Sequence, residues 1–117
     1  MKPEARTPEE LDRLLEDAFV TRDAHAVASL FADGAVLMLG AQPLGARGAD
    51  EIGGVAAALL EADATYVAAP QRVVQAGDVA LVIADGAISV ARRHGDGAWA
   101  YAIALLALDP HTTKEGQ

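Results

Sequence analysis

The stretch from Asp23 to Gly40 constrains the fold most strongly, because it reads as a short helix that passes directly into a strand. The Asp23 carboxylate can accept hydrogen bonds from the free N–H groups of the next turn, and residues 24–32 tolerate a helix. Asp33-Gly34 offers a left-handed stop to that helix, and the unbroken apolar run 35–39 predicts a strand. The other elements of the chain can be placed relative to this corner.

A longer helix precedes this corner. Thr7 is a good N-cap, Pro8 stands where its missing N–H is harmless, and Glu10 completes a capping box, so we expect a helix from Pro8 to about Arg22. At about 100° per residue its apolar residues form one stripe of roughly 140°. That stripe consists of Leu11, Leu14, Leu15, Ala18 and Phe19. Arg22 ends it, where the guanidinium either reaches water or pairs with an interior acid.

A third helix follows a loop. The segment 40–48 is rich in Gly and Pro, which predicts a loop with a brief strand near Arg47. Asp50 and Glu51 then occupy the first turn of a helix, where negative charge favours the helix dipole. Its predicted buried stripe consists of Ile52, Val55, Ala56, Leu59 and Leu60.

From Thr65 the period changes from helical to β. Four β-like runs, 65–76, 79–84, 87–93 and 98–108, are divided by Gly77-Asp78, Asp85-Gly86 and residues 94–97. Asp-Gly between two apolar runs favours a two-residue type I′ turn. A bulge within one long strand at Asp85-Gly86 is the alternative. Arg92-Arg93 at the end of the third run could pair with surface acids or hold an anion.

The last strand requires cover on both faces. After Trp99 its only polar side-chain group is the Tyr101 hydroxyl. An antiparallel sheet covered by helices on one face normally leaves the other face in water. Because helices can cover only one face here, we expect a second copy of the chain to cover the other in a homodimer.

Length and charge narrow the classes of function. With 117 residues the chain forms one domain, and 52% hydrophobic with 22% charged residues excludes disorder of its body. We expect a disordered lead at 1–6, the domain at 7–109 and a flexible tail at 110–117. A net charge of −8 speaks against nucleic acid or an anionic membrane as partner.

The absence of cysteine excludes disulfides, thiolate nucleophiles and most structural zinc sites. The three histidines show no ligand spacing, so we expect no metal and no cofactor. The first ten residues lack the apolar region of a signal peptide, and no apolar run approaches ~20 residues, so we expect a cytoplasmic location.

Three helices with a strand between the second and third, followed by meandering strands, form an α+β layout. The run RDAHAVASLFADGAV at 22–36, Gly48 with Ile52, and DGAW at 96–99 resemble the nuclear transport factor 2-like superfamily, particularly its SnoaL-like and ketosteroid-isomerase-like branches. The resemblance spans about 7–108. It implies a cystatin-like cone with three N-terminal helices on the concave side of a curved antiparallel sheet, a central pocket, and commonly a homodimer through the convex side.

The resemblance also implies where catalytic groups would stand. Ketosteroid isomerases place a carboxylate base at the end of the first strand, a tyrosine on the first helix and a protonated carboxylic acid on a later strand. The alignment puts Leu39, Leu15 and Ser89 at these positions. Two leucines can supply neither a base nor an oxyanion donor, so we expect no catalytic residues of the isomerase type.

We therefore expect a dimeric binder of a small apolar molecule without acid–base catalysis. The predicted pocket is lined by Leu15, Phe19, Leu37, Leu39, Leu59, Tyr66, Ser89 and Leu106. The same alignment turns Ala100, Ala102, Ala104 and Leu106 toward the helices and turns Trp99, Tyr101, Ile103 and Leu105 outward, toward the partner.

Two alternatives stay open. One is an isomerase or polyketide-cyclase type of enzyme in which Tyr66, Asp63 or Arg47 takes over a catalytic role. The other is a dimerisation or association module whose function lies in the outer face of its sheet.

Overall fold

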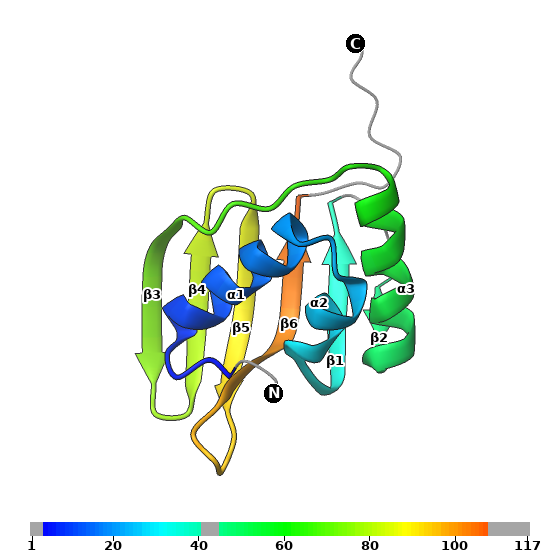
Figure 1. Ribbon diagram of the computed structural model, residues 1–117. Coiled ribbons are helices and arrows are strands. Elements are labelled where there is room, and N and C mark those ends of the chain that lie inside the picture. The colour runs from blue at the N-terminus through cyan, green and yellow to red at the C-terminus, as the bar shows by residue number, and fades with distance from the viewer. Residues whose placement is uncertain (1–3, 41–44, 108–117) are drawn as a thin grey trace.

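The computed structural model describes residues 4–40 and 45–107, so the predictions for residues 1–3, for the loop segment 41–44 and for the tail at 110–117 lie outside the described residues. Helices α1 (Pro8–Val20) and α2 (Ala24–Ser29) precede strands β1 (Phe31–Leu39) and β2 (Ala46–Arg47), and α3 (Gly48–Glu61) follows. Four strands complete the chain: β3 (Pro70–Ala76), β4 (Val79–Ala84), β5 (Ala87–Arg93) and β6 (Trp99–Leu106). Figure 1 shows the three helices on one face of a single sheet, which confirms the predicted α+β class.

The sheet has six strands in the order β2-β1-β6-β5-β4-β3. Strands β3 to β6 form an antiparallel meander, whereas β1 runs parallel to β6. The sheet is therefore mixed, and the prediction of an antiparallel sheet is wrong at this one pair. No hairpin joins β1 to β6, because β2, α3 and three strands lie between them in the chain, so no turn imposes an antiparallel direction.

The predicted caps explain where the first two helices begin. The Thr7 hydroxyl accepts a hydrogen bond from the Glu10 N–H at 3.0 Å, and the Asp23 carboxylate accepts one from the Ala26 N–H at 3.1 Å. Helix α1 ends at Val20, two residues earlier than predicted. Arg22, with a φ of +56°, then turns the chain toward α2.

The corner after α2 differs from the prediction. Helix α2 ends at Ser29, and β1 has already begun at Phe31. Asp33-Gly34 thus lies inside β1, where Gly34 has a φ of +74° and the pairing with β6 jumps from Phe31 to Val36. The dipeptide forms an irregularity in the strand rather than the stop of the helix.

The turn at Asp85-Gly86 is a hairpin, which settles the alternative that the sequence left open. Ala84 pairs with Ala87 across it, and β4 and β5 are antiparallel neighbours. Only the glycine of the dipeptide has a positive φ, of +84°, so the turn is not of type I′.

A bulge in β6 changes which of its side chains face the helices. Ile103 pairs with Val90, but Tyr101 pairs with Ala91, so Ala102 has no partner on β5. Because the alternation shifts by one residue at this point, Trp99 and Tyr101 are buried on the inner face and the prediction that they face outward is wrong. Ala104 and Leu106 are buried, and Ile103 and Leu105 are exposed, as predicted.

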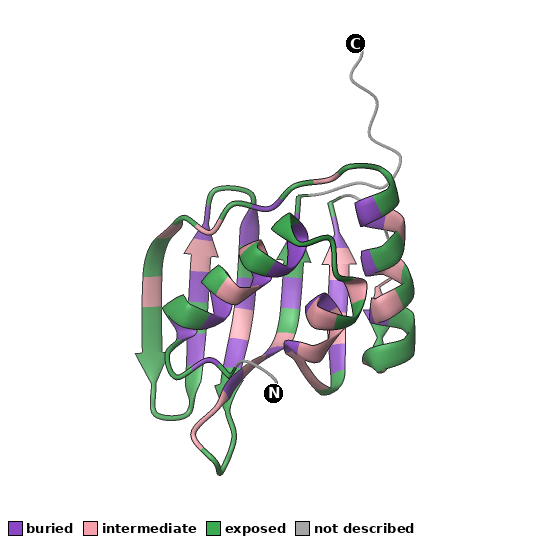
Figure 2. Ribbon diagram, in the orientation of Figure 1, coloured by how far each residue is buried: buried purple, intermediate pink, exposed green. Residues whose placement is uncertain are grey.

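The core lies between the helices and the inner face of the sheet, where Figure 2 shows buried positions on α1, α3 and the central strands. The described end of the predicted disordered lead joins this core. Ala5 is buried, and its carbonyl accepts a hydrogen bond from the Trp99 N–H at 2.9 Å. The prediction of disorder is therefore wrong for residues 4–6.

Candidate functional site

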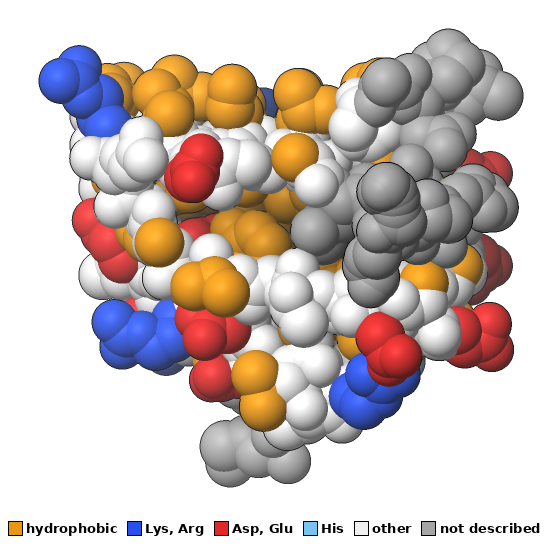
Figure 3. Space-filling view, turned by 90° about the horizontal axis from the view of Figure 1, so that it is seen from above, with side chains coloured by type: hydrophobic (Ala, Val, Ile, Leu, Met, Phe, Trp, Pro, Cys, Tyr) orange, Lys and Arg blue, Asp and Glu red, His pale blue; other side chains and the backbone are white. Residues whose placement is uncertain are grey.

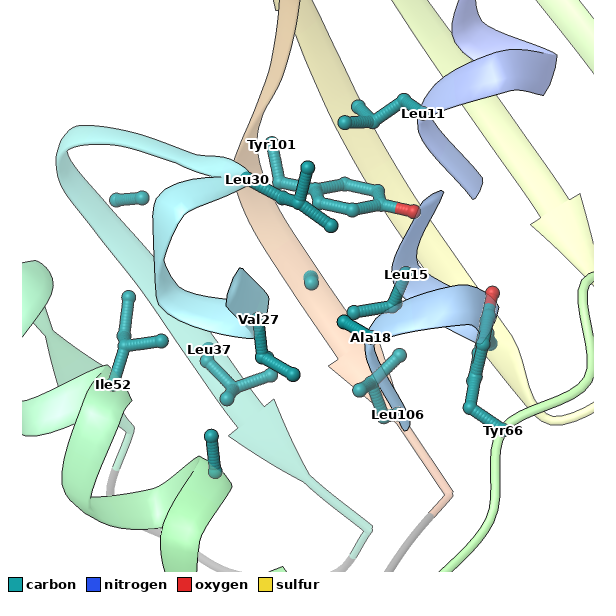
Figure 4. Close-up of a cluster of buried hydrophobic side chains, with 14 of the residues drawn as sticks. Leu11, Leu15, Ala18, Val27, Leu30, Leu37, Ile52, Tyr66, Tyr101 and Leu106 are labelled. Atoms are coloured by element: carbon teal, nitrogen blue, oxygen red, sulfur yellow. The ribbon is translucent and has the colours of Figure 1, made fainter. Parts of the chain in front are cut away.

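All eight residues predicted to line a pocket are buried in the space between helices and sheet. They come from α1 (Leu15, Phe19), β1 (Leu37, Leu39), α3 (Leu59), the segment before β3 (Tyr66), β5 (Ser89) and β6 (Leu106). The most exposed of them, Tyr66, retains 8% of its surface. Figure 4 shows several of these side chains pointing toward one another from α1, β1 and β6. The structure thus brings the predicted set together as interior residues.

A polar cluster lies within this apolar interior and consists of Asp12, Tyr66 and Tyr101. The Asp12 carboxyl group is 1% exposed, and its Oδ1 accepts hydrogen bonds from the Tyr66 hydroxyl at 2.5 Å and the Tyr101 hydroxyl at 2.8 Å. Both phenol rings extend toward α1, one from each side of the cluster of leucines (Figure 4). Two tyrosines that are far apart in the sequence therefore donate to the same oxygen atom of Asp12.

Different elements position the three side chains. Asp12 lies on α1, Tyr101 is turned inward by the bulge at Ala102, and Tyr66 belongs to the α3–β3 segment, residues 62–69. Each tyrosine ring also packs on a phenylalanine, because the ring centroids of Phe19 and Tyr66 are 6.1 Å apart and those of Phe31 and Tyr101 are 5.2 Å apart.

The α3–β3 segment is held to α1 by further polar contacts. The Ala68 N–H donates to a Glu16 carboxylate oxygen at 2.9 Å, one helical turn beyond Asp12. The Arg22 guanidinium donates to the Leu60 carbonyl and forms an ion pair with Asp63 at 3.2 Å. Arg22 thus binds the exposed end of α3, and not an interior acid. These contacts fix the segment that carries Tyr66.

Burial and the neighbouring carboxylate control the protonation of both tyrosines. Desolvation, followed by the hydrogen bond and charge of Asp12, raises the pKa of Tyr66 well above its usual value. Desolvation, followed by the charge of Asp12, also raises the pKa of Tyr101. Both phenols therefore stay protonated at neutral pH and act as hydrogen-bond donors.

One oxygen of the cluster has no partner. Asp12 Oδ2 is buried, and no donor among residues 4–40 and 45–107 reaches it. An unsatisfied buried polar atom costs about 1–3 kcal/mol, so such atoms are rare in folded proteins. Among the described residues, Asp12 Oδ2 is the buried side-chain oxygen that lacks a hydrogen-bond partner.

Sequence reasoning missed Asp12 although a signal was present. On α1 the residue lies about 100° from Leu11, which is about 20° beyond the Phe19 edge of the apolar stripe. Pro8, one turn earlier, is also buried on this side. The sequence signal for a buried Asp12 was thus its position as a single acidic residue at the edge of the apolar stripe.

Other residues that the sequence singled out lie away from the interior. Arg47 is exposed at the start of α3, and Asp63 is exposed in its ion pair with Arg22, so Tyr66 alone of the three alternative catalytic residues is buried. Arg93 pairs with Asp78 at 2.6 Å and stacks over Trp99, which fits a salt-bridge role. In the described parts of the chain, no group of three or more His, Asp or Glu residues could hold a metal ion.

Surface clefts open around the described residues. One of them, the upper cleft, is largely apolar and has a volume of about 320 Å³ at the end of the molecule where β1 and β6 terminate. It is lined by Gly40, Ala84, Gly86, Ala87, Ile88, Leu105, Leu106 and Ala107. A cleft of about 510 Å³ lies at the opposite end, between the β1 irregularity and β6, and one of about 460 Å³ lies beside α2 and α3. Of these three clefts in the described part of the chain, the upper cleft includes a residue of the predicted pocket, Leu106.

Figure 3 views the molecule from the end that carries the upper cleft. Hydrophobic side chains lie at the bottom of a hollow between the helices and the sheet. The α3–β3 segment runs along this same end in Figure 1. Tyr66 belongs to this segment, and its hydroxyl reaches Asp12 in the interior. No helix in the described part of the chain is both long enough and apolar enough to cross a membrane.

Comparison with known families supports this arrangement of helices and sheet. The profile of the SnoaL-like domain matches residues 11–109. The chain belongs to the SnoaL-like family. A comparison of this SnoaL-like protein with curated proteins gave no match.

Solved structures show the same fold. A ketosteroid isomerase-like protein from Erwinia carotovora atroseptica is 23% identical, with a TM-score of 0.73 over 86% of this chain and 92% of that chain. A Thiobacillus denitrificans protein, proposed to be a calcium/calmodulin-dependent protein kinase type II association domain, is 17% identical, with a TM-score of 0.75 over 92% and 98%. A nuclear transport factor 2-like protein with a cystatin-like fold from Novosphingobium aromaticivorans is 17% identical, with a TM-score of 0.65 over 90% and 81%. At these identities the likeness is one of fold.

The polar cluster predicts a specific pattern of stability changes. Asp12→Leu leaves two buried hydroxyls without their acceptor, so we expect the free energy of unfolding to fall by about 2–5 kcal/mol. Adding Tyr66→Phe and Tyr101→Phe removes the stranded hydroxyls, and the triple variant should return to within about 1 kcal/mol of the wild type. Urea denaturation followed by circular dichroism measures both values. A triple variant no more stable than Asp12→Leu would contradict the mutual dependence of the three groups.

The raised pKa values predict how the protein responds to alkali. The chain has two tyrosines, and both belong to the cluster. The unfolded chain releases its phenol protons near pH 10, whereas the folded chain keeps them. The contribution of the two tyrosines to the free energy of unfolding is therefore fully present below about pH 10 and decreases above it. Phenolate absorbance should therefore stay absent in the folded protein at about pH 11 and appear together with unfolding. Ionisation near pH 10 with unchanged circular dichroism would count against the buried cluster.

Proposed function

We propose that this SnoaL-like protein is a homodimer that binds a small, largely apolar molecule between its helices and sheet, without acid–base catalysis. The observation that supports binding most directly is the position of Leu106. Its side chain belongs to the buried interior cluster and also lines the upper cleft, so the apolar interior reaches the surface at that cleft. A cleft of about 320 Å³ falls within the range of small-molecule sites.

The chemistry of the interior favours binding over catalysis. Among residues 4–40 and 45–107, the buried residues other than Ser89 and Asp12 are hydrophobic or carry a tyrosine hydroxyl. Such an interior binds by burying apolar ligand surface, at roughly 25 cal/mol per Å². The two phenols are protonated at neutral pH, since burial only raises pKa values that ordinarily lie near 10, so neither accepts a proton from a substrate.

The outer face of the sheet supports a homodimer. Cross-strand pairing aligns its side chains into two rows that cross the five strands β3, β4, β5, β6 and β1. The first row is Val74, Leu81, Val90, Ile103 and Val36, and the second is Arg72, Ile83, Ile88, Leu105 and Met38. Figure 3 shows hydrophobic side chains along this face, at the upper edge of the view. An apolar surface of this extent is typical of an association site.

The same face favours the second candidate, an association module that uses its sheet and binds no ligand. The fold shared with the Thiobacillus denitrificans protein is compatible with that function but does not argue for it at 17% identity. The third candidate, an isomerase or cyclase, is favoured by the burial of Tyr66 next to Asp12. Catalysed exchange of a proton beside a ketone would distinguish that enzyme from a binder.

Native mass spectrometry tests ligand binding. We expect an assembly of twice the 12.0 kDa of one chain that carries an additional small molecule. Ala107→Trp places a large side chain at the exposed rim of the upper cleft and should abolish the adduct while the dimer persists. Ala57→Trp, on the exposed side of α3, is the matched control and should keep it. A dimer without any adduct would favour the association module.

Charge placed on the outer face tests the dimer. Ile103 is 50% exposed in the first row, and Ile103→Asp should convert the protein to a monomer of 12.0 kDa, because the carboxylate would be desolvated at the interface. Ile88→Asp tests the second row. Val20→Asp, at a 72% exposed position on α1, is the control that should leave the dimer intact. Sedimentation analysis measures the masses, and unchanged dimers in both outer-face variants would place the interface elsewhere.

A further inference from the structure

The polar cluster lacks one hydrogen-bond partner, and the kind of partner that fits can be inferred from the atoms around it. Asp12 Oδ1 already accepts from two hydroxyls, whereas Oδ2 accepts from none among the described residues. A carboxylate oxygen only accepts hydrogen bonds. The missing partner is therefore a donor, an O–H or N–H group that residues 4–40 and 45–107 do not supply.

The two tyrosines cannot take over this role. Each hydroxyl has one proton, and each proton is already directed at Oδ1. The contacts of Phe19 with Tyr66 and of Phe31 with Tyr101 hold the two rings in place. The carboxyl group is thus held through Oδ1, while Oδ2 has no partner among the described residues.

The surroundings of Oδ2 define the rest of the ligand. The buried side chains on the elements that enclose the cluster are chiefly leucines, alanines and aromatic rings, and Ser89 and Asp12 are the buried polar residues of the described chain. Tyr66 reaches the cluster from the α3–β3 segment, which runs along the hollowed end of the molecule. A group bound beside Oδ2 would therefore meet apolar walls and a single carboxyl acceptor.

We propose that Asp12 Oδ2 binds the hydroxyl or N–H group of an otherwise apolar ligand, with Tyr66 and Tyr101 acting as positioning residues that hold the carboxylate. This inference rests on the proposed binding function and adds the class of ligand to it. Apolar alcohols, phenols and N–H heterocycles fit the site. Ethers and hydrocarbons of the same shape leave Oδ2 unsatisfied and bind more weakly.

A matched pair of probes tests the inference. Naphthol and naphthyl methyl ether share an apolar body, but only naphthol has a donor. A hydrogen bond to a charged acceptor corresponds to a factor of about ten or more in the dissociation constant, so calorimetric titration of the wild type should show that preference for naphthol.

Variants locate the origin of the preference. The triple variant Asp12→Leu with Tyr66→Phe and Tyr101→Phe keeps an apolar interior without the acceptor, so it should bind both probes with constants within about two-fold of each other. Asp17→Asn, an exposed position on α1, is the control that should keep the wild-type preference. Circular dichroism checks that each variant is folded. Tyr66→Phe alone should reduce the preference while leaving the affinity for the ether unchanged, which a purely structural role would not do.

The outcomes separate this inference from the proposed function. Equal binding of both probes by the wild type would overturn the donor inference, with Oδ2 then satisfied by water, and would leave small-molecule binding standing. A preference that survives in the folded triple variant would also overturn it, because the donor would then be recognised elsewhere. Binding of neither probe by the wild type would overturn the proposed function and this inference with it.

Discussion

The bulge at Ala102 in β6 is the constraint on which both faces of the sheet depend. Strand β6 lies between β1 and β5 near the middle of the sheet, so the phase of its side chains decides what each face contains. The bulge leaves Ala102 without a partner on β5, and the alternation shifts there by one residue. Tyr101 before the bulge and Ala104 after it therefore both point inward, while Ile103 points outward. Without the shift, the Tyr101 hydroxyl would lie among the aliphatic rows of the outer face.

The inward position of Tyr101 and the burial of Asp12 require each other. In an aliphatic interior, a phenol without an acceptor and a carboxylate without donors would both be costly, and a low local dielectric increases either cost. Together they remove most of that cost, because Oδ1 receives hydrogen bonds from both tyrosines. The second carboxyl oxygen, Oδ2, remains without a hydrogen-bond partner among the described residues. A buried unsatisfied polar group in a natural protein calls for an explanation, and the one that we propose here is a bound donor group.

The sequence predicted the helices and strands well, but it predicted poorly which side chains of β6 face the helices. The difference is that the helix and turn signals are local, whereas the facing of β6 depends on a bulge. Capping residues, helical spacing and turn dipeptides act locally, so the helices began where Thr7 and Asp23 indicated and the meander had its expected turns. The run from Trp99 to Leu106 is apolar on both sides, so no polar residue marks the point where a bulge exchanges its faces. Asp12 was missed because the stripe on α1 was defined by apolar residues alone, and its tyrosine partners are 54 and 89 residues away. The parallel pairing of β1 with β6 also depends on contacts distant in sequence.

The distribution of the aromatic residues indicates how the two faces differ in selectivity. The chain has only five aromatic residues: Phe19, Tyr66, Trp99 and Tyr101 are buried in the core, and Phe31 packs against Tyr101. The two rows on the outer face contain Val, Leu, Ile and Met with one Arg at the end of the second row. Aromatic rings and the groups of the polar cluster have directional preferences, whereas aliphatic side chains contribute burial with little dependence on orientation. For the function proposed above, selection among small molecules would thus belong to the interior, and the outer face suits a broad, non-directional contact between two sheets.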